Sequence, residues 1–135
     1  TEHWLDQPDP GFVFENRSLI KYRLIVDEFG GWDLFQTLLT TVKALADKHG
    51  VSMSAVAARY VLDQPQVGAV IIGARYAHHL PQTLSIFELS LDPDDYAALE
   101  AVLAQRHGPS GYVYELESDR TGRHGSIMKY NLNAS

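Results

Sequence analysis

Residues 67–75 read Val67-Gly-Ala-Val-Ile-Ile-Gly-Ala-Arg75, and this stretch decides what kind of fold the chain can have. Its first six residues are rich in β-branched side chains and lie between Pro65 and Gly73, which is the pattern of a short strand. Apolar residues occupy both sides of the segment, as is typical of a parallel strand that is covered on both faces. We therefore predict a strand over residues 67–72.

Helical patterns fill most of the sequence around this strand. Apolar residues recur at three- and four-residue spacing in about five segments. These segments begin near Asn16, Leu34, Ser52, Ala77 and Asp92. The predicted fold class is therefore mostly α, with about five helices and one short strand, and the pattern fits a slice of a larger α/β fold.

The single strand leaves three arrangements open, because one strand cannot satisfy its own backbone hydrogen bonds. It pairs with a second chain, or it pairs with strands outside the given sequence, or the segment is an extended connector in a helical domain.

The two ends of the sequence differ from its middle. Residues 1–15 are predicted to form an irregular N-terminal arm, because Pro8, Pro10 and Gly11 interrupt any helix there. Residues 107–135 form a polar, glycine-containing C-terminal tail without a clear period. The helical portion between them covers residues 16–106.

Composition excludes several classes of function. The net charge of −6 and the absence of a long basic run argue against nucleic-acid binding. There is no cysteine, which excludes disulfides and thiolate chemistry. The sequence contains no apolar segment typical of a signal peptide or a membrane span, so we expect a cytoplasmic protein without membrane contact.

The chemically richest feature is the turn that follows the predicted strand. Gly73 and Arg75 come between the strand and the start of a helix, where free backbone N–H groups attract anions. The guanidinium of Arg75 suits bidentate phosphate binding. From spacing alone, an ordinary surface arginine explains the same residue equally well.

Four motifs, in this order and spacing, resemble the aldo/keto reductase family over residues 32–105. They are Leu45-Ala-Asp-Lys-His-Gly-Val-Ser52, Val56-Ala-Ala-Arg-Tyr-Val-Leu62, Val70-Ile-Ile-Gly-Ala-Arg75 and Leu91-Asp-Pro-Asp-Asp95. The resemblance implies a (β/α)₈ TIM barrel that binds NADPH and transfers hydride to an aldehyde or ketone. It also implies that this chain is the C-terminal portion, following the seventh barrel strand.

The same resemblance implies a cofactor site around the Gly73 turn. In the family, the segment after the last strand holds the adenosine 2′-phosphate, so Arg75 is expected to pair with that phosphate. The neighbouring family positions carry a small hydroxyl residue, Gln, Glu and Asn. This sequence replaces them, and we expect the replacements to contact the adenosine. They are Tyr76, His79, Gln82 and Thr83.

No catalytic residue is assigned, because the family's motifs for the catalytic Asp, Tyr, Lys and His do not occur in this sequence. No metal site is assigned either. His78 and His79 are adjacent, so their side chains point about 100° apart on a helix. Asp92, Asp94 and Asp95 lie at a predicted helix start, where capping explains them.

The leading hypothesis is the cofactor-phosphate portion of an NADP-dependent reductase, inactive alone and binding NADP weakly or not at all by itself. The alternatives are a non-enzymatic helical interaction module and one half of a split reductase. The expected partners are the nucleotide cofactor and the missing N-terminal barrel portion, in cis or in trans. Self-association through uncovered apolar faces is also expected.

Overall fold

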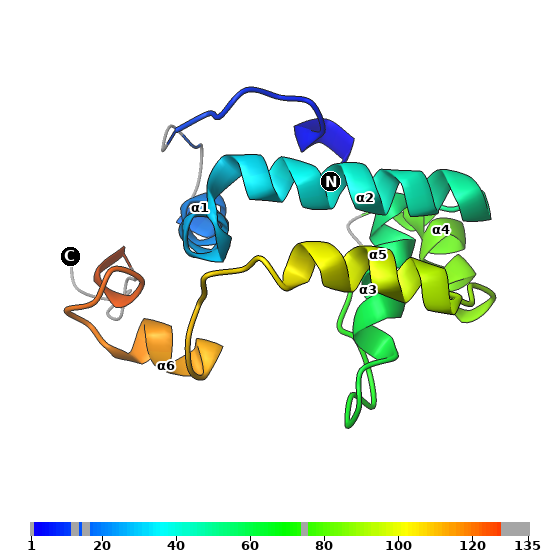
Figure 1. Ribbon diagram of the computed structural model, residues 1–135. Helices are drawn as coiled ribbons and strands as arrows, with labels where there is room; N and C mark the ends of the chain where they lie inside the picture. Colours follow the sequence, from blue (N-terminus) through cyan, green and yellow to red (C-terminus); the bar gives the residue numbers. More distant parts are fainter. Residues whose placement is uncertain (1, 12–13, 15–16, 74–75, 128–135) are drawn as a thin grey trace. The chain divides into compact units, whose positions relative to one another are not determined.

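The computed structural model describes residues 2–11, 14, 17–73 and 76–127, and the regular elements of these residues are helices joined by turns and irregular connectors (Figure 1). Short 3-10 turns η1, η2, η3 and η4 span Glu2–Trp4, Ala77–His79, Ser85–Phe87 and Gly125–Ile127. The α-helices are α1 (Arg17–Phe29), α2 (Gly31–His49), α3 (Met53–Leu62), α4 (Leu80–Leu84), α5 (Pro93–Leu103) and α6 (Val113–Ser118). The predicted mostly helical character is confirmed, and the helices α1, α2, α3 and α5 follow the predicted segments.

The chain divides into two compact units. Unit 1 comprises Thr1–Gln7 and Gln36–Ala104, and unit 2 comprises Pro8–Phe35 and Gln105–Ser135. No helix in the described residues is both long enough and apolar enough to cross a membrane.

The prediction of a strand over residues 67–72 is wrong. Residues 67–73 are described and have no strand structure, and they connect α3 to η2. The side chain of Ile71 is 101% exposed and that of Ile72 is 40% exposed. A β-branched segment forms a strand only when a neighbouring strand pairs with its backbone, and the described residues offer it none. The structure thus shows an irregular connector, which was one of the three arrangements.

The predicted helical segment over residues 77–87 is confirmed as helical but is divided into three short elements. These are η2, α4 and η3 in succession. Pro81 has no backbone N–H and lies in the first turn of α4, where that loss is tolerated.

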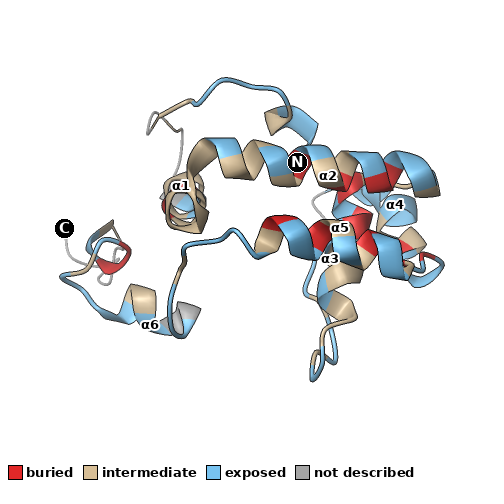
Figure 2. Cartoon of the chain, in the orientation of Figure 1, coloured by how far each residue is buried: buried red, intermediate tan, exposed pale blue. Residues whose placement is uncertain are grey.

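Unit 1 has the better-developed core (Figure 2). The buried face of α2 carries Leu39, Val42, Leu45 and Ala46, as the apolar stripe predicts. Met53 and Val56 of α3 are the innermost apolar side chains, at 1% and 0% exposure. The core is completed by Ala55, Ile86, Leu89, Leu91, Leu99 and Val102.

Unit 2 is organised around a buried arginine of α1. Arg23 is 8% exposed and donates from both terminal nitrogens to the carboxylate of Asp9, at 2.6 and 2.8 Å. Its Nε lies 2.9 Å from Asp27 Oδ1, and its guanidinium lies over the ring of Trp32, 5.3 Å from the centroid. A planar cation that is paired and stacked in this way tolerates burial, so Arg23 fixes the N-terminal arm to α1.

The start of α3 allows a simple stability prediction. Ser52 has extended backbone, and its Oγ accepts a hydrogen bond from Ala55 N at 3.2 Å. The Ser52→Ala substitution is expected to lower the free energy of unfolding by about 1 kcal/mol, because one N–H of the first turn loses its partner. Urea titration measures this, with the exposed Ser90 changed to alanine as the matched control. Equal stability of the two variants would contradict the capping role.

Candidate functional site

The predicted cofactor site lies on the connector and the short helical elements of unit 1. Gly73, Tyr76, His79 and Gln82 are exposed, and Thr83 is half-buried. The hydroxyl of Thr83 donates to the backbone oxygen of His79 at 3.2 Å, which stabilises the turn between η2 and α4. Arg75, the expected phosphate partner, lies outside the described residues.

The aromatic rings of Tyr76, His78 and His79 lie close together. The rings of Tyr76 and His78 are stacked, with centroids 5.5 Å apart and planes 15° from parallel. His78 and His79 have centroids only 4.1 Å apart, and Tyr76 lies 6.1 Å from His79. Sequence reasoning selected Tyr76 and His79 but gave no role to His78. The group offers flat, accessible surfaces with hydrogen-bonding nitrogens.

Large apolar side chains of the same region are exposed. The exposed residues between positions 61 and 87 are Val61, Ile71, Ile72, Tyr76, Leu80, Leu84 and Phe87.

The acidic group at the start of α5 caps that helix, as predicted. Asp92 accepts from the backbone N–H groups of Asp94 and Asp95, both at 3.0 Å. The carboxylate of Asp95 in turn accepts from Asp92 N at 2.9 Å, which completes a capping box. These carboxylates are occupied by structural contacts, which confirms the structural interpretation of this cluster.

The same carboxylates join α5 to the end of α2. Lys48 Nζ lies 2.6 Å from both Asp92 Oδ2 and Asp95 Oδ1, and His49 Nε2 lies 2.7 Å from Asp95 Oδ2. Burial alone would raise the pKa of Asp95, but hydrogen bonds from Lys48, the Asp92 backbone and His49 lower it to about 2. Hydrogen bonds to Asp92 and Asp95 raise the pKa of Lys48 to about 12.

A second polar link joins α3 to α5. Arg59 forms an ion pair with Asp63, and Tyr96 donates its phenolic hydrogen to Asp63 Oδ2 at 2.5 Å. The hydrogen bond from Arg59 holds the pKa of Asp63 below its usual value. Tyr60 also hydrogen-bonds Glu100. This link orients two helices and presents no vacant carboxylate to a ligand.

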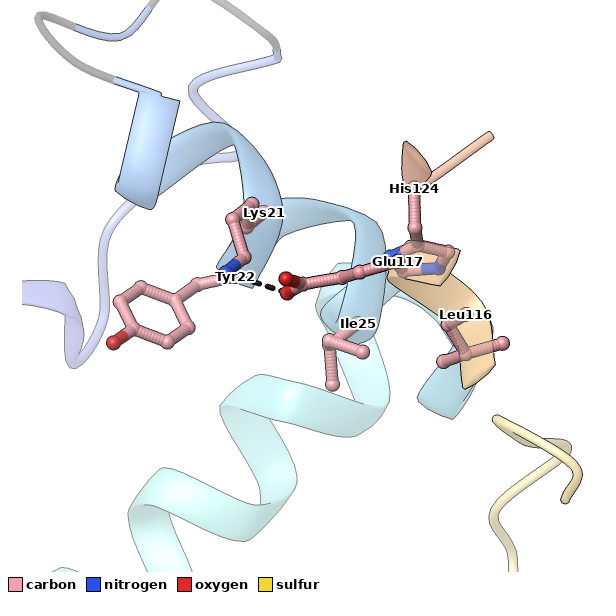
Figure 3. A pocket seen from close by; sticks show the side chains of 6 residues that line it. All are labelled: Lys21, Tyr22, Ile25, Leu116, Glu117 and His124. Atoms are coloured by element: carbon pink, nitrogen blue, oxygen red, sulfur yellow. Dashed lines mark ion pairs between the residues drawn. The ribbon is translucent and has the colours of Figure 1, made fainter. Parts of the chain in front are cut away.

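In unit 2, the C-terminal segment is attached to α1 by charged pairs. Lys21 Nζ lies 2.5 Å from Glu117 Oε1, and Arg123 lies 2.6 Å from Asp27 Oδ2. A small hollow of about 140 Å³ lies beside the first pair, and its lining includes His124 (Figure 3).

The most buried member of this group is His124, at 5% exposure, with its Nε2 2.7 Å from Glu28 Oε1. Sequence reasoning missed these pairs. The partners lie 96 residues apart and no motif joins them.

No group of three or more His, Cys, Asp or Glu side chains in the described ranges is arranged to hold a metal ion. His78 and His79 contact each other and Tyr76.

Comparison with known protein families identifies the class of protein to which the chain belongs. The model of the aldo/keto reductase family matches residues 3–104, which is more than half of the 135-residue chain. The chain therefore belongs to the aldo/keto reductase family, and the resemblance seen in the four motifs is confirmed. Searches of curated proteins and of solved structures gave no match.

Membership of this family has direct consequences. The family consists of oxidoreductases that generally use NAD(P)H, and its fold is a TIM barrel. The matched region contains the whole of the predicted cofactor segment. It ends before the C-terminal segment of unit 2, so residues 105–135 lie outside the family match.

Proposed function

We propose that this chain forms the C-terminal, cofactor-phosphate-binding portion of an NADP-dependent aldo/keto reductase, which reduces a carbonyl group by hydride transfer when complete. The observation that carries the proposal is the family match over residues 3–104, which includes the sequence Gly73-Ala-Arg75.

The residues of the segment suit a nucleotide that bears an extra phosphate. Residues 64–87 contain no acidic residue, although the chain as a whole carries a net charge of −6. A dianionic 2′-phosphate that binds to this segment is therefore not repelled by any carboxylate of residues 64–87. Arg75 supplies a permanent planar cation. The stacked rings of Tyr76 and His78 offer a flat surface of the kind that adenine stacks on.

Each residue of the segment has a distinct proposed role. Arg75 pairs with the 2′-phosphate, and Gly73 allows the backbone to approach it. Tyr76 stacks on the adenine ring, while His79 and Gln82 hydrogen-bond the adenosine. Thr83 supports His79 through its hydroxyl. Arg75 is the largest contributor, because a bidentate guanidinium–phosphate pair is stronger than neutral hydrogen bonds.

The chain is proposed to be inactive alone, because the family's catalytic motifs do not occur in its sequence and hydride transfer requires a positioned acid beside the nicotinamide. The remaining barrel strands, in cis or in trans, would then cover the apolar side chains exposed between positions 61 and 87. Cofactor binding by the isolated chain is expected to be weak or absent.

The test uses a complete reductase that contains this sequence. Its melting temperature is measured with saturating NADPH and with NADH at the same concentration. A larger upward shift with NADPH is expected, because at equal concentrations the ligand with the lower dissociation constant stabilises the folded state more. Equal shifts with both cofactors would contradict the proposed contact with the 2′-phosphate. The absence of a shift with either cofactor would contradict the proposed cofactor site.

A helical interaction module or one half of a split reductase is the second candidate, and the exposed side chains of Ile71, Leu84 and Phe87 favour it. If this candidate is correct, the isolated chain self-associates or copurifies with a chain that supplies the other barrel strands. Sedimentation velocity distinguishes the states. A concentration-independent monomer with a sharp cooperative melt would exclude self-association through this surface.

A further inference from the structure

Residues 107–127 of unit 2 form a C-terminal strap that lies outside the family match and is joined to α1 by polar contacts. His107 N donates to the backbone oxygen of Phe29 at 2.9 Å. Three side-chain pairs join the strap to the same helix, and Figure 3 shows the first of them. The pairs are Lys21 with Glu117 at 2.5 Å, Asp27 with Arg123 at 2.6 Å, and Glu28 with His124 at 2.7 Å.

Apolar packing between the strap and α1 is incomplete. Among the described side chains of residues 107–127, none that is apolar is buried. Three hollows of about 140, 340 and 250 Å³ lie between the two parts, and each is lined by Leu116 of the strap and by a residue of α1. Leu116 itself is only half-buried. Little apolar area therefore holds the strap in place, and the polar pairs carry a large share of the attachment.

Two of the three pairs are open to water. Lys21 and Glu117 are both partly exposed, and Arg123 is exposed where it meets Asp27. Ion pairs of this kind are individually weak, and dissolved salt screens them. The attachment of the strap is therefore expected to weaken as the ionic strength rises.

Opening of the strap would not leave a buried charge without a partner on α1. Asp27 Oδ1 lies 2.9 Å from Arg23 Nε, so this carboxylate keeps a cation when Arg123 moves away. Arg23 in turn stays paired with Asp9. Lys21 and Glu28 are partly exposed and can be hydrated. The large cost of an isolated buried charge, which would otherwise oppose opening, is avoided.

From these contacts we propose that the strap opens from α1 as a unit while the core of unit 1 stays folded, and that ionic strength sets the fraction of open chains. Segments with few buried apolar contacts open at lower free energy than the core. Unit 1 has such a core, built from the buried side chains of α2, α3 and α5. Neither the family match nor the proposed cofactor site accounts for this behaviour.

The test is limited digestion of the full chain with trypsin, with the cleaved bonds identified by mass spectrometry. Cleavage after Arg120 and Arg123 reports opening of the strap, because a protease cuts the transiently opened form. Cleavage after Arg59 of α3 reports unfolding of unit 1. A synthetic peptide of residues 113–127 corrects for the effect of salt on the protease. Between about 0.05 and 0.5 M NaCl, the corrected rate in the strap is expected to rise about threefold or more relative to Arg59. An unchanged ratio would overturn the proposal.

Two variants of α6 test the role of the ion pairs. Glu117→Gln removes the pair with Lys21, whereas Glu115→Gln removes the same charge at an exposed position two residues away. At low salt, Glu117→Gln is expected to raise cleavage of the strap about threefold, and Glu115→Gln to leave it at the wild-type rate. At high salt the three proteins should be cut alike, because the pair is already screened. Equal effects of the two variants, or a difference that persists at high salt, would contradict control by ionic strength.

Discussion

The Asp95→Asn variant is expected to lose about 2 kcal/mol of folding free energy, because the substitution replaces a buried carboxylate by an amide that cannot accept from all of its donors. Asp95 is 1% exposed, and its two oxygens serve Lys48, His49 and the backbone N–H of Asp92. An amide of the same shape presents one acceptor and one donor. At least one of the three donors that face Asp95 therefore loses its hydrogen bond.

The same residue makes stability depend on pH. The pKa of Asp95 is about 2 in the folded chain, against 3.8 for an ordinary aspartate. A lowered pKa stabilises the folded state above the unfolded pKa, and this contribution disappears as the pH falls from about 4 to about 2. The wild type is therefore expected to lose stability more steeply than Asp95→Asn over that interval.

Urea titrations at several pH values measure both effects. The neighbouring Asp94→Asn substitution is the control, because Asp94 is exposed and lies one residue away. Parallel pH profiles for the wild type and Asp95→Asn would contradict the assignment of this pH dependence to Asp95.

The Met53→Ala variant is expected to lose about 3 kcal/mol, which is typical of a large side chain removed from a packed core. Met53 is 1% exposed and begins α3, directly beside the fully buried Val56. Its loss leaves a cavity among the helices of unit 1. Chemical denaturation followed by circular dichroism measures the change.

A conservative change at the same position provides the control. Met53→Leu keeps the volume and is expected to cost less than about 1.5 kcal/mol. If alanine and leucine were equally tolerated, Met53 would not be a core residue and the packing of α3 would have to be revised.

The helices could be predicted because their signals are local. The apolar stripe of α2 and the Asp92-Pro93 start of α5 determine those elements from within a few residues. The capping role of Asp95 could be predicted for the same reason, because it also depends only on residues within a few positions.

The strand prediction failed because strand formation depends on a neighbour. Residues 67–72 have the composition of a strand, but the described chain supplies no strand to pair with them. A sequence pattern reports the preference of a segment and not the presence of its partner.

The charged pairs of unit 2 could not be predicted from the sequence, for a related reason. Glu28 and His124 are 96 residues apart, and their polar residue types are typical of exposed positions in an α-helix and in a loop. Only the folded chain brings them together.

The proposed role of Arg75 in binding the 2′-phosphate of NADP is tested most directly by the Arg75→Ala variant of the complete reductase. Equilibrium titration gives the dissociation constants of NADPH and NADH for the wild type and the variant. We expect the constant for NADPH to rise about thirtyfold, the equivalent of about 2 kcal/mol for a charge-assisted pair. The constant for NADH is expected to stay within about twofold. Unchanged NADPH binding, or an equal loss for both cofactors, would contradict the claim.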